Sequence, residues 1–339
     1  MTNISKNELA ESSRIPCSPP KIATVPTQVE RPLWSVMIPT YNDLPHLQET
    51  MESVLSHKIG PERMQIAVID DCSTKGDVME TVQSTGGDRI EYFRQHKNVG
   101  SLRNFETCIN HSNGRWVHIL HGDDMVMPGF YEEIEMLFNK YPEAGAAFTN
   151  TAHTLAESNI LEVHAHLASE PGILNDFLLQ NAQRLLLQPP SIVVKRSVYE
   201  QLGGFYAAHY GEDWEMWTRI AAHYPIAYSP KCLAHYRYWT NNSITQTFIA
   251  TGQNVRDIIN VINIMQNYIP LDQRARIRRL ASKNYALYCL SLADSLFTHD
   301  KKAAIVQAKG AMRLTKDLKV FYLFLKHMAK HTLLYRIMT

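Results

Sequence analysis

Residues 116–124 read WVHILHGDD, and this stretch decides the fold prediction. Apolar side chains dominate residues 116–120, as in a buried strand of a parallel sheet, and two carboxylates follow at Asp123 and Asp124. Ligands of open α/β sheets bind beyond the carboxyl ends of strands, where paired carboxylates can coordinate Mg²⁺ or Mn²⁺ and, through the ion, substrate phosphates. The stretch therefore predicts a strand that delivers a metal-binding pair to one edge of a sheet.

Apolar runs and amphipathic stretches alternate on both sides of this strand. Such alternation implies an α/β fold with a mostly parallel sheet and helices on both of its faces. Residues 151–185 read less clearly, as a loop and a helix. The predicted strands are 34–38, 65–69, 90–94, 116–120, 146–150 and 191–194, and helices are predicted near 76–84, 101–111, 129–140 and 196–202.

The composition indicates a globular protein with more than one structural unit. The chain has 339 residues, of which 45% are hydrophobic and 20% are charged. Residues 1–30 are rich in Ser, Pro, Thr and Glu, so we expect a disordered or loosely packed leader there. We expect the α/β domain to occupy residues 31–250 and a basic helical region to follow at 251–339.

The last part of the chain is strongly basic. Residues 271–339 contain 14 Lys and Arg against 4 Asp and Glu, a net charge of +10, and the remainder carries −9. Such a region can contact anionic lipid, nucleic acid or the acidic body of its own protein, and we expect no nucleic-acid partner. A helical projection places Lys319, Lys326 and Lys330 opposite an apolar face made of Val320, Phe321, Phe324, Leu325, Met328 and Tyr335. This face could lie on a membrane or pack on the protein.

The cysteines and the hydropathy suggest a reducing compartment. The five cysteines lie far apart and lack the spacing of a zinc site or a disulfide framework. The chain shows no signal sequence, and no run approaches the ~18 apolar residues of a spanning helix. We expect a cytoplasmic protein, with peripheral contact at the inner face of the membrane through the basic helices.

Five short motifs carry a resemblance to a known family. Their order is similar to that of inverting family 2 glycosyltransferases of the GT-A fold, and the resemblance covers roughly residues 34–245. It implies a Rossmann-like fold that binds nucleotide-diphospho sugars. The motifs are PTYN at 39–42, DDCS at 70–73, NVGSLRN at 98–104, GDD at 122–124 and GED at 211–213.

The resemblance places Pro39, Tyr41 and Asp71, together with Asp70, around the nucleotide base. A Tyr face can stack on a base, which contributes roughly 1–3 kcal/mol, and a carboxylate can accept the imino hydrogen of uracil. The alternative is that Tyr41 only enters a helix and that the two aspartates cap the next turn.

Two arginines are candidate partners of the donor diphosphate. Arg103 lies where a helix begins, although the alternative of a solvated arginine stays open. Family members often carry a Tyr-Arg pair, which corresponds here to Tyr236 and Arg237, so the resemblance makes Arg237 the second candidate. Trp239 stands where the family usually has a metal-site His, and His235 either substitutes for it or is an ordinary buried His.

The family's acidic motif is commonly Asp-x-Asp, and here His121 occupies its first position. Asp123 is therefore the main metal candidate, with Asp124 and His121 beside it. Mg²⁺ prefers oxygen ligands whereas Mn²⁺ also accepts a neutral His, so either ion is expected as the cofactor. The alternative is that the aspartates only initiate the helix that follows.

The GED motif supplies the candidate catalytic acids. In the family its Asp takes the proton of the acceptor hydroxyl, so Asp213 is the expected base and Glu212 the expected assistant. Trp214 and Trp217 belong either to the core or to an acceptor pocket, since sugar rings present apolar faces to aromatic side chains.

These inferences predict an inverting glycosyltransferase with a UDP-sugar donor. The acceptor is expected to be a saccharide, a lipid-linked molecule or a protein in the synthesis of cell-envelope polysaccharide or another glycoconjugate. The rival hypothesis is an inactive nucleotide-sugar-binding protein with an assembly or regulatory role, because His121 and Trp239 depart from the family pattern. A nicotinamide-dependent dehydrogenase is a weaker alternative, since no Gly-x-Gly-x-x-Gly follows the first strand.

Overall fold

The computed structural model of the chain describes residues 14–26, 28, 30–155, 159–238 and 244–338. It divides into two compact units. The first consists of Met1–Phe177, Leu187–Ala207 and His223–Thr240, and the second of Leu178–Leu186, Ala208–Ala222 and Asn241–Thr339.

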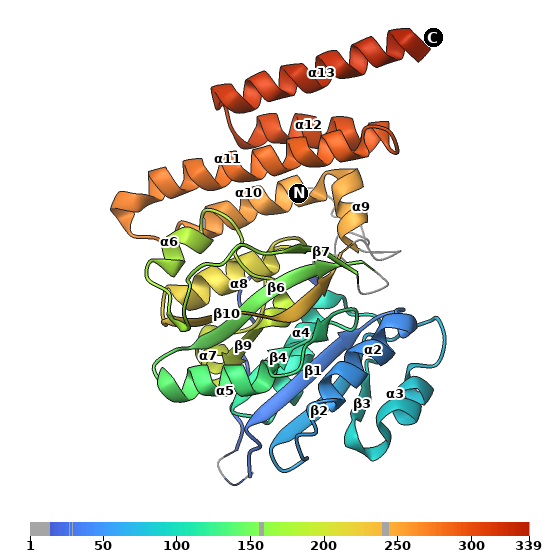
Figure 1. Cartoon of the computed structure of the whole chain (residues 1–339), viewed down its shortest axis with the longest axis vertical. Helices are drawn as coiled ribbons and strands as arrows, with labels where there is room; N and C mark the ends of the chain where they lie inside the picture. The colour runs from blue at the N-terminus through green and yellow to red at the C-terminus, as the bar shows by residue number, and fades with distance from the viewer. Residues whose placement is uncertain (1–13, 27, 29, 156–158, 239–243, 339) are drawn as a thin grey trace, which may run out of the picture. The chain divides into compact units, whose positions relative to one another are not determined.

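The first unit is built around one sheet, shown in Figure 1. Two short strands, β7 (Ile160–Val163) and β8 (Gly172–Ile173), pair with β6 and β10. The remaining strands follow the order β3 (Glu91–Arg94), β2 (Met64–Asp70), β1 (Trp34–Thr40), β4 (Trp116–Ile119), β9 (Ile192–Lys195), β6 (Ala146–Thr154), β10 (Ile226–Arg237) and β5 (Met125–Val126).

The predicted α/β fold is confirmed, with antiparallel strands inserted into the parallel framework. Strands β3, β2, β1 and β4 are parallel to one another, and β6 is parallel to β10. Strand β9 lies antiparallel between β4 and β6. The sequence could not predict this reversal, because an apolar run has the same pattern in either direction.

Helices cover both faces of the sheet because the strands are apolar on both sides. Helices α2 (Leu44–Leu55), α3 (Val78–Gly86) and α5 (Phe130–Lys140) bury their apolar stripes against one face. Helix α4 (Ser101–His111) packs on β1, β2 and β4. The smaller elements of the unit are α7 (Arg196–Leu202) and the 3₁₀ turns η1 (Gly87–Arg89) and η2 (Pro189–Ser191).

The register of the parallel strands brings their carboxyl ends to one edge. Thr40 of β1 lies opposite Asp70 of β2. Beyond the end of β4, the Gly122 N–H donates to the Pro39 carbonyl over 3.1 Å. Three of the five motifs therefore meet at this edge, as expected for an α/β ligand site.

Residues 14–26, in the predicted leader, make defined contacts within the first unit. The Pro16 carbonyl accepts a hydrogen bond from the Ala207 N–H at 3.0 Å, and the Pro20 carbonyl accepts one from the Gly204 N–H at 2.9 Å. Ile22 is 6% exposed. The domain boundaries expected at residues 30 and 250 remain predictions.

The second unit is helical, which confirms the predicted helical region. A cluster centred on Ala286, Cys289 and Ala308 forms one of its cores. None of the helices in the described ranges combines the length and apolar content needed to cross a bilayer. The helices are α8 (Glu212–Ala221), α9 (Ile244–Thr251), α10 (Gln253–Met265), α11 (Leu271–Leu296), α12 (Lys301–Leu314) and α13 (Leu318–Met338), and α6 (Phe177–Asn181) ends in this unit.

The apolar residues of α13 do not form a single packed face. Val320 is fully buried and Phe324 is partly buried against the core cluster of this unit. Phe321 and Leu325 were expected on the same face, yet they are 45% and 49% exposed, and Tyr322 is 66% exposed. The helix therefore packs one apolar stripe and leaves another uncovered among the described residues. The Tyr335 side chain lies outside the described part of the chain.

Candidate functional site

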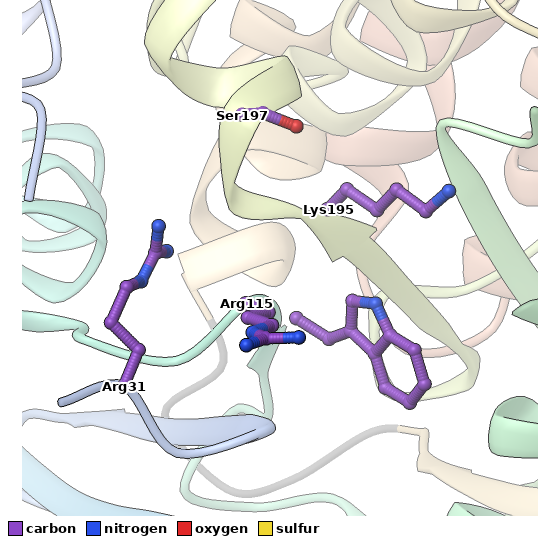
Figure 2. A pocket seen from close by; sticks show the side chains of 5 residues that line it. Arg31, Arg115, Lys195 and Ser197 are labelled. Atoms are coloured by element: carbon purple, nitrogen blue, oxygen red, sulfur yellow. The ribbon is translucent and has the colours of Figure 1, made fainter. Parts of the chain in front are cut away.

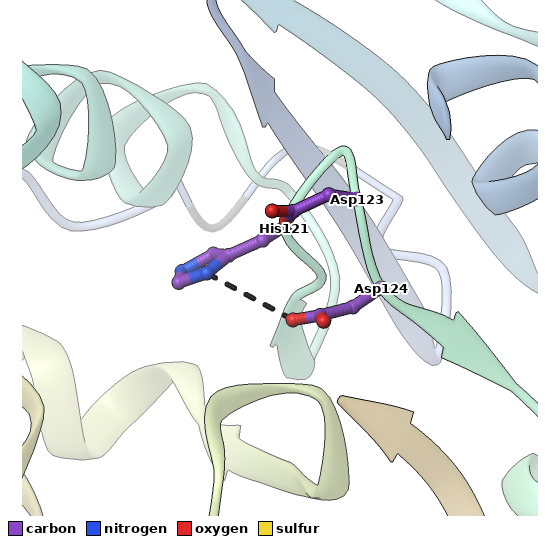
Figure 3. A group of neighbouring side chains, drawn as sticks. All are labelled: His121, Asp123 and Asp124. Atoms are coloured by element: carbon purple, nitrogen blue, oxygen red, sulfur yellow. Dashed lines mark ion pairs between the residues drawn. The ribbon is translucent and has the colours of Figure 1, made fainter. Parts of the chain in front are cut away.

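The loop after β4 gathers His121, Asp123 and Asp124, as Figure 3 shows. One possible ligand atom from each residue lies within 4.8 Å of the others, and His121 Nδ1 is 3.9 Å from Asp124 Oδ2. A Cβ at Gly122 would lie 3.2 Å from the Pro39 carbonyl oxygen, so glycine allows the loop to approach β1 this closely. The structure thus brings the three predicted metal-site residues together.

Asp124 is positioned by the backbone and keeps one oxygen unbonded. The residue is 1% exposed, and its Oδ1 accepts a hydrogen bond from the Arg237 N–H at 2.9 Å. Its Oδ2 is buried and has no hydrogen-bond partner among the described residues. A buried carboxylate oxygen without a partner is costly, and a bound cation would satisfy it.

The surroundings change the protonation of all three groups. Burial lowers the pKa of His121 to about 4, so the imidazole is neutral at pH 7 and can offer a lone pair; its ring stacks on Phe105. Burial and the charge of Asp43 raise the pKa of Asp123 to about 6. Burial and the neighbouring Asp123 raise the pKa of Asp124 well above its usual range. The pair holds a proton readily unless a cation compensates its charge.

Two carboxylates and one neutral imidazole suit a divalent cation such as Mn²⁺, which accepts both oxygen and nitrogen ligands. The orphaned Asp124 oxygen is the observation in favour of this fit.

Arg237, a predicted diphosphate contact, supports this loop from β10. Its Nε donates to the Asp123 carbonyl at 2.8 Å, and its guanidinium forms an ion pair with Glu49 of α2 at 2.6 Å. Arg237 is 3% exposed. These bonds make Arg237 a positioning residue of the acidic loop.

His235 lies on β10 opposite Met125 of β5 and is 8% exposed. Its Nδ1 is buried and has no hydrogen-bond partner among the described residues, and burial lowers its pKa. These features fit an ordinary buried His. Trp239 lies outside the described residues.

The two aspartates at the end of β2 have different surroundings. Asp70 is fully buried and accepts hydrogen bonds from the Ser73 N–H at 2.8 Å, the Tyr92 hydroxyl at 2.9 Å and the Arg94 guanidinium at 2.6 Å. These bonds fit a structural role for its carboxylate.

Asp71 holds the loop that precedes α4. Its two carboxylate oxygens accept the N–H groups of Val99 and Gly100 at 2.7 and 2.9 Å. Burial raises the pKa of Asp71, and the two N–H groups oppose that rise. Gly100 has φ 89°, a backbone conformation that favours glycine.

The turns at this edge contain backbone that is unusual for residues other than glycine. Asn42 after β1 has φ 58° and Cys72 after β2 has φ 61°. The Asn42 carboxamide oxygen accepts the Thr74 and Lys75 N–H groups at 2.7 and 3.0 Å, which ties the two turns together. Strained residues of this kind cluster at ligand sites.

Of the remaining donor candidates, two are accessible. Pro39 is buried within β1, whereas Tyr41 is 46% exposed and so can meet a ligand. Arg103 is half-exposed in the first turn of α4 and pairs with Glu106 at 2.7 Å.

The predicted catalytic acids lie in the first turn of α8, in the second unit. Burial raises the pKa of Asp213 to about 6, although its Oδ1 accepts the Trp214 N–H at 2.7 Å. Burial and the charge of Asp213 raise the pKa of Glu212 well above its usual range. Gly211 begins the turn with φ 87°.

Trp214 and Trp217 are both 3% exposed and therefore belong to the core. The Trp214 indole donates to the Asn181 carbonyl. One turn later, Glu215 and Arg219 form a buried ion pair at 3.0 Å. The core interpretation of the tryptophans accounts for their packing.

A separate cavity of about 300 Å³ opens where β4 begins, at the edge opposite the acidic loop (Figure 2). It is basic, but its Arg31 guanidinium already donates to the carbonyls of Asn113 and Gly114 at 2.9 and 2.8 Å. The cavity is lined by Arg31, Arg115, Trp116, Lys195 and Ser197.

Sequence reasoning missed several residues that build the site. Glu49 and the Tyr92–Arg94 pair act through partners far away in the sequence, and no local pattern identifies them. Arg14 lies in a segment that was expected to be loosely packed, and its guanidinium donates to Asn98. Asn42 had a local signal, since Asn tolerates positive φ at the end of a strand.

The sequence of this chain is similar to those of known proteins. Residues 35–203 match the family described as "Glycosyl transferase family 2". An uncharacterized protein of Mycobacterium tuberculosis is 26% identical over 67% of this chain and 73% of its own length. The putative teichuronic acid biosynthesis glycosyltransferase TuaG of Bacillus subtilis is 24% identical over 63% of this chain and 82% of its own length. The match spans 35% of an uncharacterized Rickettsia felis glycosyltransferase, about a third of that relative.

Solved structures share the fold. Residues 1–349 of S. aureus TarS in complex with UDP-GlcNAc superpose with a TM-score of 0.61 at 13% identity, covering 87% of this chain and 79% of TarS 1–349. The mannosyltransferase PcManGT of Pyrobaculum calidifontis, in complex with GDP-Man and Mn²⁺, gives a TM-score of 0.54 at 16% identity, covering 95% and 85%. The matched domain, the relatives and the shared fold together show that this chain is a glycosyltransferase of the GT-A fold and belongs to glycosyl transferase family 2.

Proposed function

We propose that this enzyme transfers a sugar, with inversion, from a nucleotide-diphosphate donor to an acceptor hydroxyl, and that the donor is a UDP sugar. The observation that carries the proposal is the cluster of His121, Asp123 and Asp124 at the carboxyl edge of the sheet, with one buried carboxylate oxygen unbonded. A ligand that brings a cation and phosphates would satisfy that oxygen.

The proposed donor site extends from this cluster along the same edge. Tyr41 is exposed and can stack on the base, and Asp71 fixes the loop that leads into α4. The UDP-GlcNAc and GDP-Man complexes of structures with the same fold support a nucleotide sugar as the ligand class.

Asp123, Asp124 and His121 would hold Mn²⁺ or Mg²⁺, with Arg237 and Glu49 keeping the loop in place. The bound ion would neutralise charge on the departing nucleotide diphosphate. The complex of PcManGT with Mn²⁺ supports this cofactor class.

Asp213 is the proposed base. It takes the proton of the acceptor hydroxyl as the oxygen attacks the anomeric carbon, and the bond from that carbon to the diphosphate breaks in the same displacement. A pKa of about 6 keeps Asp213 ionised at pH 7 while leaving it more basic than an exposed carboxylate. Glu212 is proposed to assist by orienting the acceptor.

The proposed acceptor is a saccharide or lipid-linked molecule, or a protein, in cell-envelope polysaccharide or glycoconjugate synthesis. The names of two relatives, in teichuronic and minor teichoic acid biosynthesis, support this class. The second of these matches over 32% of this chain and 12% of its own length.

We further propose that the enzyme works at the cytoplasmic face of the membrane through α13. Phe321, Tyr322 and Leu325 are exposed beside Lys319 and Lys326, a combination suited to an anionic lipid surface. Co-sedimentation with vesicles of phosphatidylglycerol, compared with vesicles of phosphatidylcholine, tests this contact, and equal binding to both would contradict it.

The deciding experiment for the function measures donor binding. UDP, GDP and dTDP sugars are titrated with and without Mn²⁺ while thermal unfolding is followed, because a ligand of the native state raises the unfolding temperature. We expect a metal-dependent rise with a UDP sugar. The variant Asp124→Asn is titrated in the same way. Asp88→Asn, which changes an exposed acid, is its matched control. No shift with any of the donors would contradict the proposed donor site.

A further inference from the structure

The segment that precedes β1 brings a cation to the loop before α4. The Arg14 guanidinium donates a hydrogen bond to the Asn98 carboxamide. Its Nε is buried and has no hydrogen-bond partner among the described residues. A Cβ added to Gly100 would lie 2.9 Å from that Nε, which shows how closely Arg14 approaches the loop.

Residues 14–23, which we call the N-terminal arm, are held in place by hydrogen bonds. Besides the bonds from Ala207 and Gly204 to the Pro16 and Pro20 carbonyls, the Ala23 N–H donates to Asn110 of α4 at 3.0 Å. The buried Arg196 donates to the Ala23 carbonyl at 3.0 Å. The arm is therefore fixed on both sides of Ile22, and it carries Arg14 to a defined position.

The groups around Arg14 belong to the proposed donor site. Asp71 binds the two N–H groups that follow Asn98, and the charge of Arg14 acts on its carboxylate. A guanidinium has five N–H donors in a fixed fork, and it binds anionic or carbonyl oxygens well. A buried donor without a partner is costly in the free protein, so a ligand oxygen that accepts from it gains affinity.

We propose that Arg14 is a nucleotide-binding residue, and that the N-terminal arm forms one wall of the donor site. Its unbonded Nε–H donates to an acceptor oxygen of the nucleoside diphosphate. This inference rests on the proposed function, and it extends the site to a segment that lies before the matched family domain.

The test is calorimetric titration of the full chain with UDP in the presence of Mn²⁺. In Arg14→Ala we expect the Kd for UDP to rise about tenfold or more, as for loss of a hydrogen bond to a charged group. Arg14→Lys keeps the positive charge but lacks the guanidinium N–H groups, so its affinity for UDP should fall less than that of Arg14→Ala. Lys21→Ala removes an exposed cation from the same arm and should match wild type.

Donor hydrolysis by the same variants separates binding from packing. Arg14→Ala should raise the KM for the UDP sugar more than it lowers kcat, with an unfolding temperature close to that of wild type. Titration with uridine locates the contact: a loss that persists with uridine assigns it to the nucleoside, and a loss seen only with UDP assigns it to the diphosphate. Both results support the proposal.

Two outcomes overturn the inference and leave the proposed function standing. One is an unchanged Kd for UDP in Arg14→Ala, and the other is tighter binding, which would identify the arm as a segment that competes with the nucleotide. If wild type binds neither UDP nor GDP with Mn²⁺, the proposed donor site itself fails.

Discussion

In the described part of the chain, burial raises the pKa values of two pairs of adjacent acids, Asp123–Asp124 and Glu212–Asp213, and the surroundings of the two pairs differ. The first pair follows a strand, receives an N–H from Arg237 and lies beside a neutral imidazole. The second pair begins a helix, where the charges of Asp213 and Asp257 both raise the pKa of Glu212. Under the proposed function, the first pair of adjacent acids binds a cation and the second pair takes up a proton, so the surroundings of each pair decide its role.

Replacing Asp213 should have the largest effect on turnover. Asp213→Asn removes the proposed base and should lower kcat by about 10²–10⁴-fold, while the Kd for the donor stays within a few-fold of wild type. Asp272→Asn changes an acid at the same position of another helix in the same unit and should leave kcat unchanged. Steady-state transfer assays and calorimetry give both quantities. A variant that retains full kcat would remove Asp213 from the chemistry.

Replacing Asp124 should instead affect the metal. Asp124→Asn removes the buried oxygen that has no partner, so the affinity for Mn²⁺ should fall by roughly 10–100-fold. Paramagnetic relaxation of solvent water reports bound Mn²⁺ directly. The Asp88→Asn control should bind Mn²⁺ like wild type. If Asp124→Asn also binds Mn²⁺ with wild-type affinity, the proposed difference between the two acid pairs is wrong.

The pH dependence of metal binding should follow the raised pKa of Asp123. Below about pH 6 this carboxyl is protonated, so Mn²⁺ must displace a proton and its affinity should fall by about tenfold per pH unit. Titrations from pH 5 to 8 measure the slope. An affinity that stays constant across this range would mean that Asp123 is not a ligand.

The same raised pKa has a consequence for stability in the absence of metal. A carboxyl whose pKa is higher in the folded than in the unfolded state stabilises the fold at low pH, and this contribution is lost as the pH rises from about 4 to 6. Asp123→Asn should therefore be more stable than wild type at pH 7.5, on the order of 1 kcal/mol, and the difference should vanish near pH 4. Chemical denaturation at both pH values measures it, and a destabilised variant at pH 7.5 would contradict the argument.

The smallest effect is expected at Glu49. Its ion pair with Arg237 is exposed on the glutamate side, so Glu49→Gln should weaken Mn²⁺ binding by only about 2–5-fold. Glu52→Gln, on the same helix, is the matched control. A loss as large as that of Asp124→Asn would show that Arg237 depends on this pair for its position.

Local pattern was sufficient for much of the fold. The predicted helices at 101–111 and 196–202 coincide with α4 and α7, because their apolar positions recur at the helical period. Strand β10 is absent from the predicted strands, since Ser229, Pro230 and Lys231 interrupt its apolar run. The register with β6 shifts at that place.

In the candidate site too, some features follow from local sequence and others depend on contacts between distant elements. Adjacent acids after an apolar strand were visible in the sequence, and the structure places His121 beside them. The different surroundings of Asp70 and Asp71 were not visible, because Tyr92, Arg94 and the loop at 98–100 come from other elements. The Arg237–Glu49 pair joins residues 188 positions apart, and such pairing follows from topology.

The attachment of the N-terminal arm has a consequence for how its sequence can vary. The arm is held largely through main-chain carbonyls, those of Pro16, Pro20 and Ala23, and a carbonyl is common to every amino acid. Its path can therefore persist while most of its side chains drift among homologues. Arg14, Pro16 and Ile22 are the exceptions, since the first acts through its guanidinium and the other two are buried. Selection on this segment should therefore concentrate on these three positions.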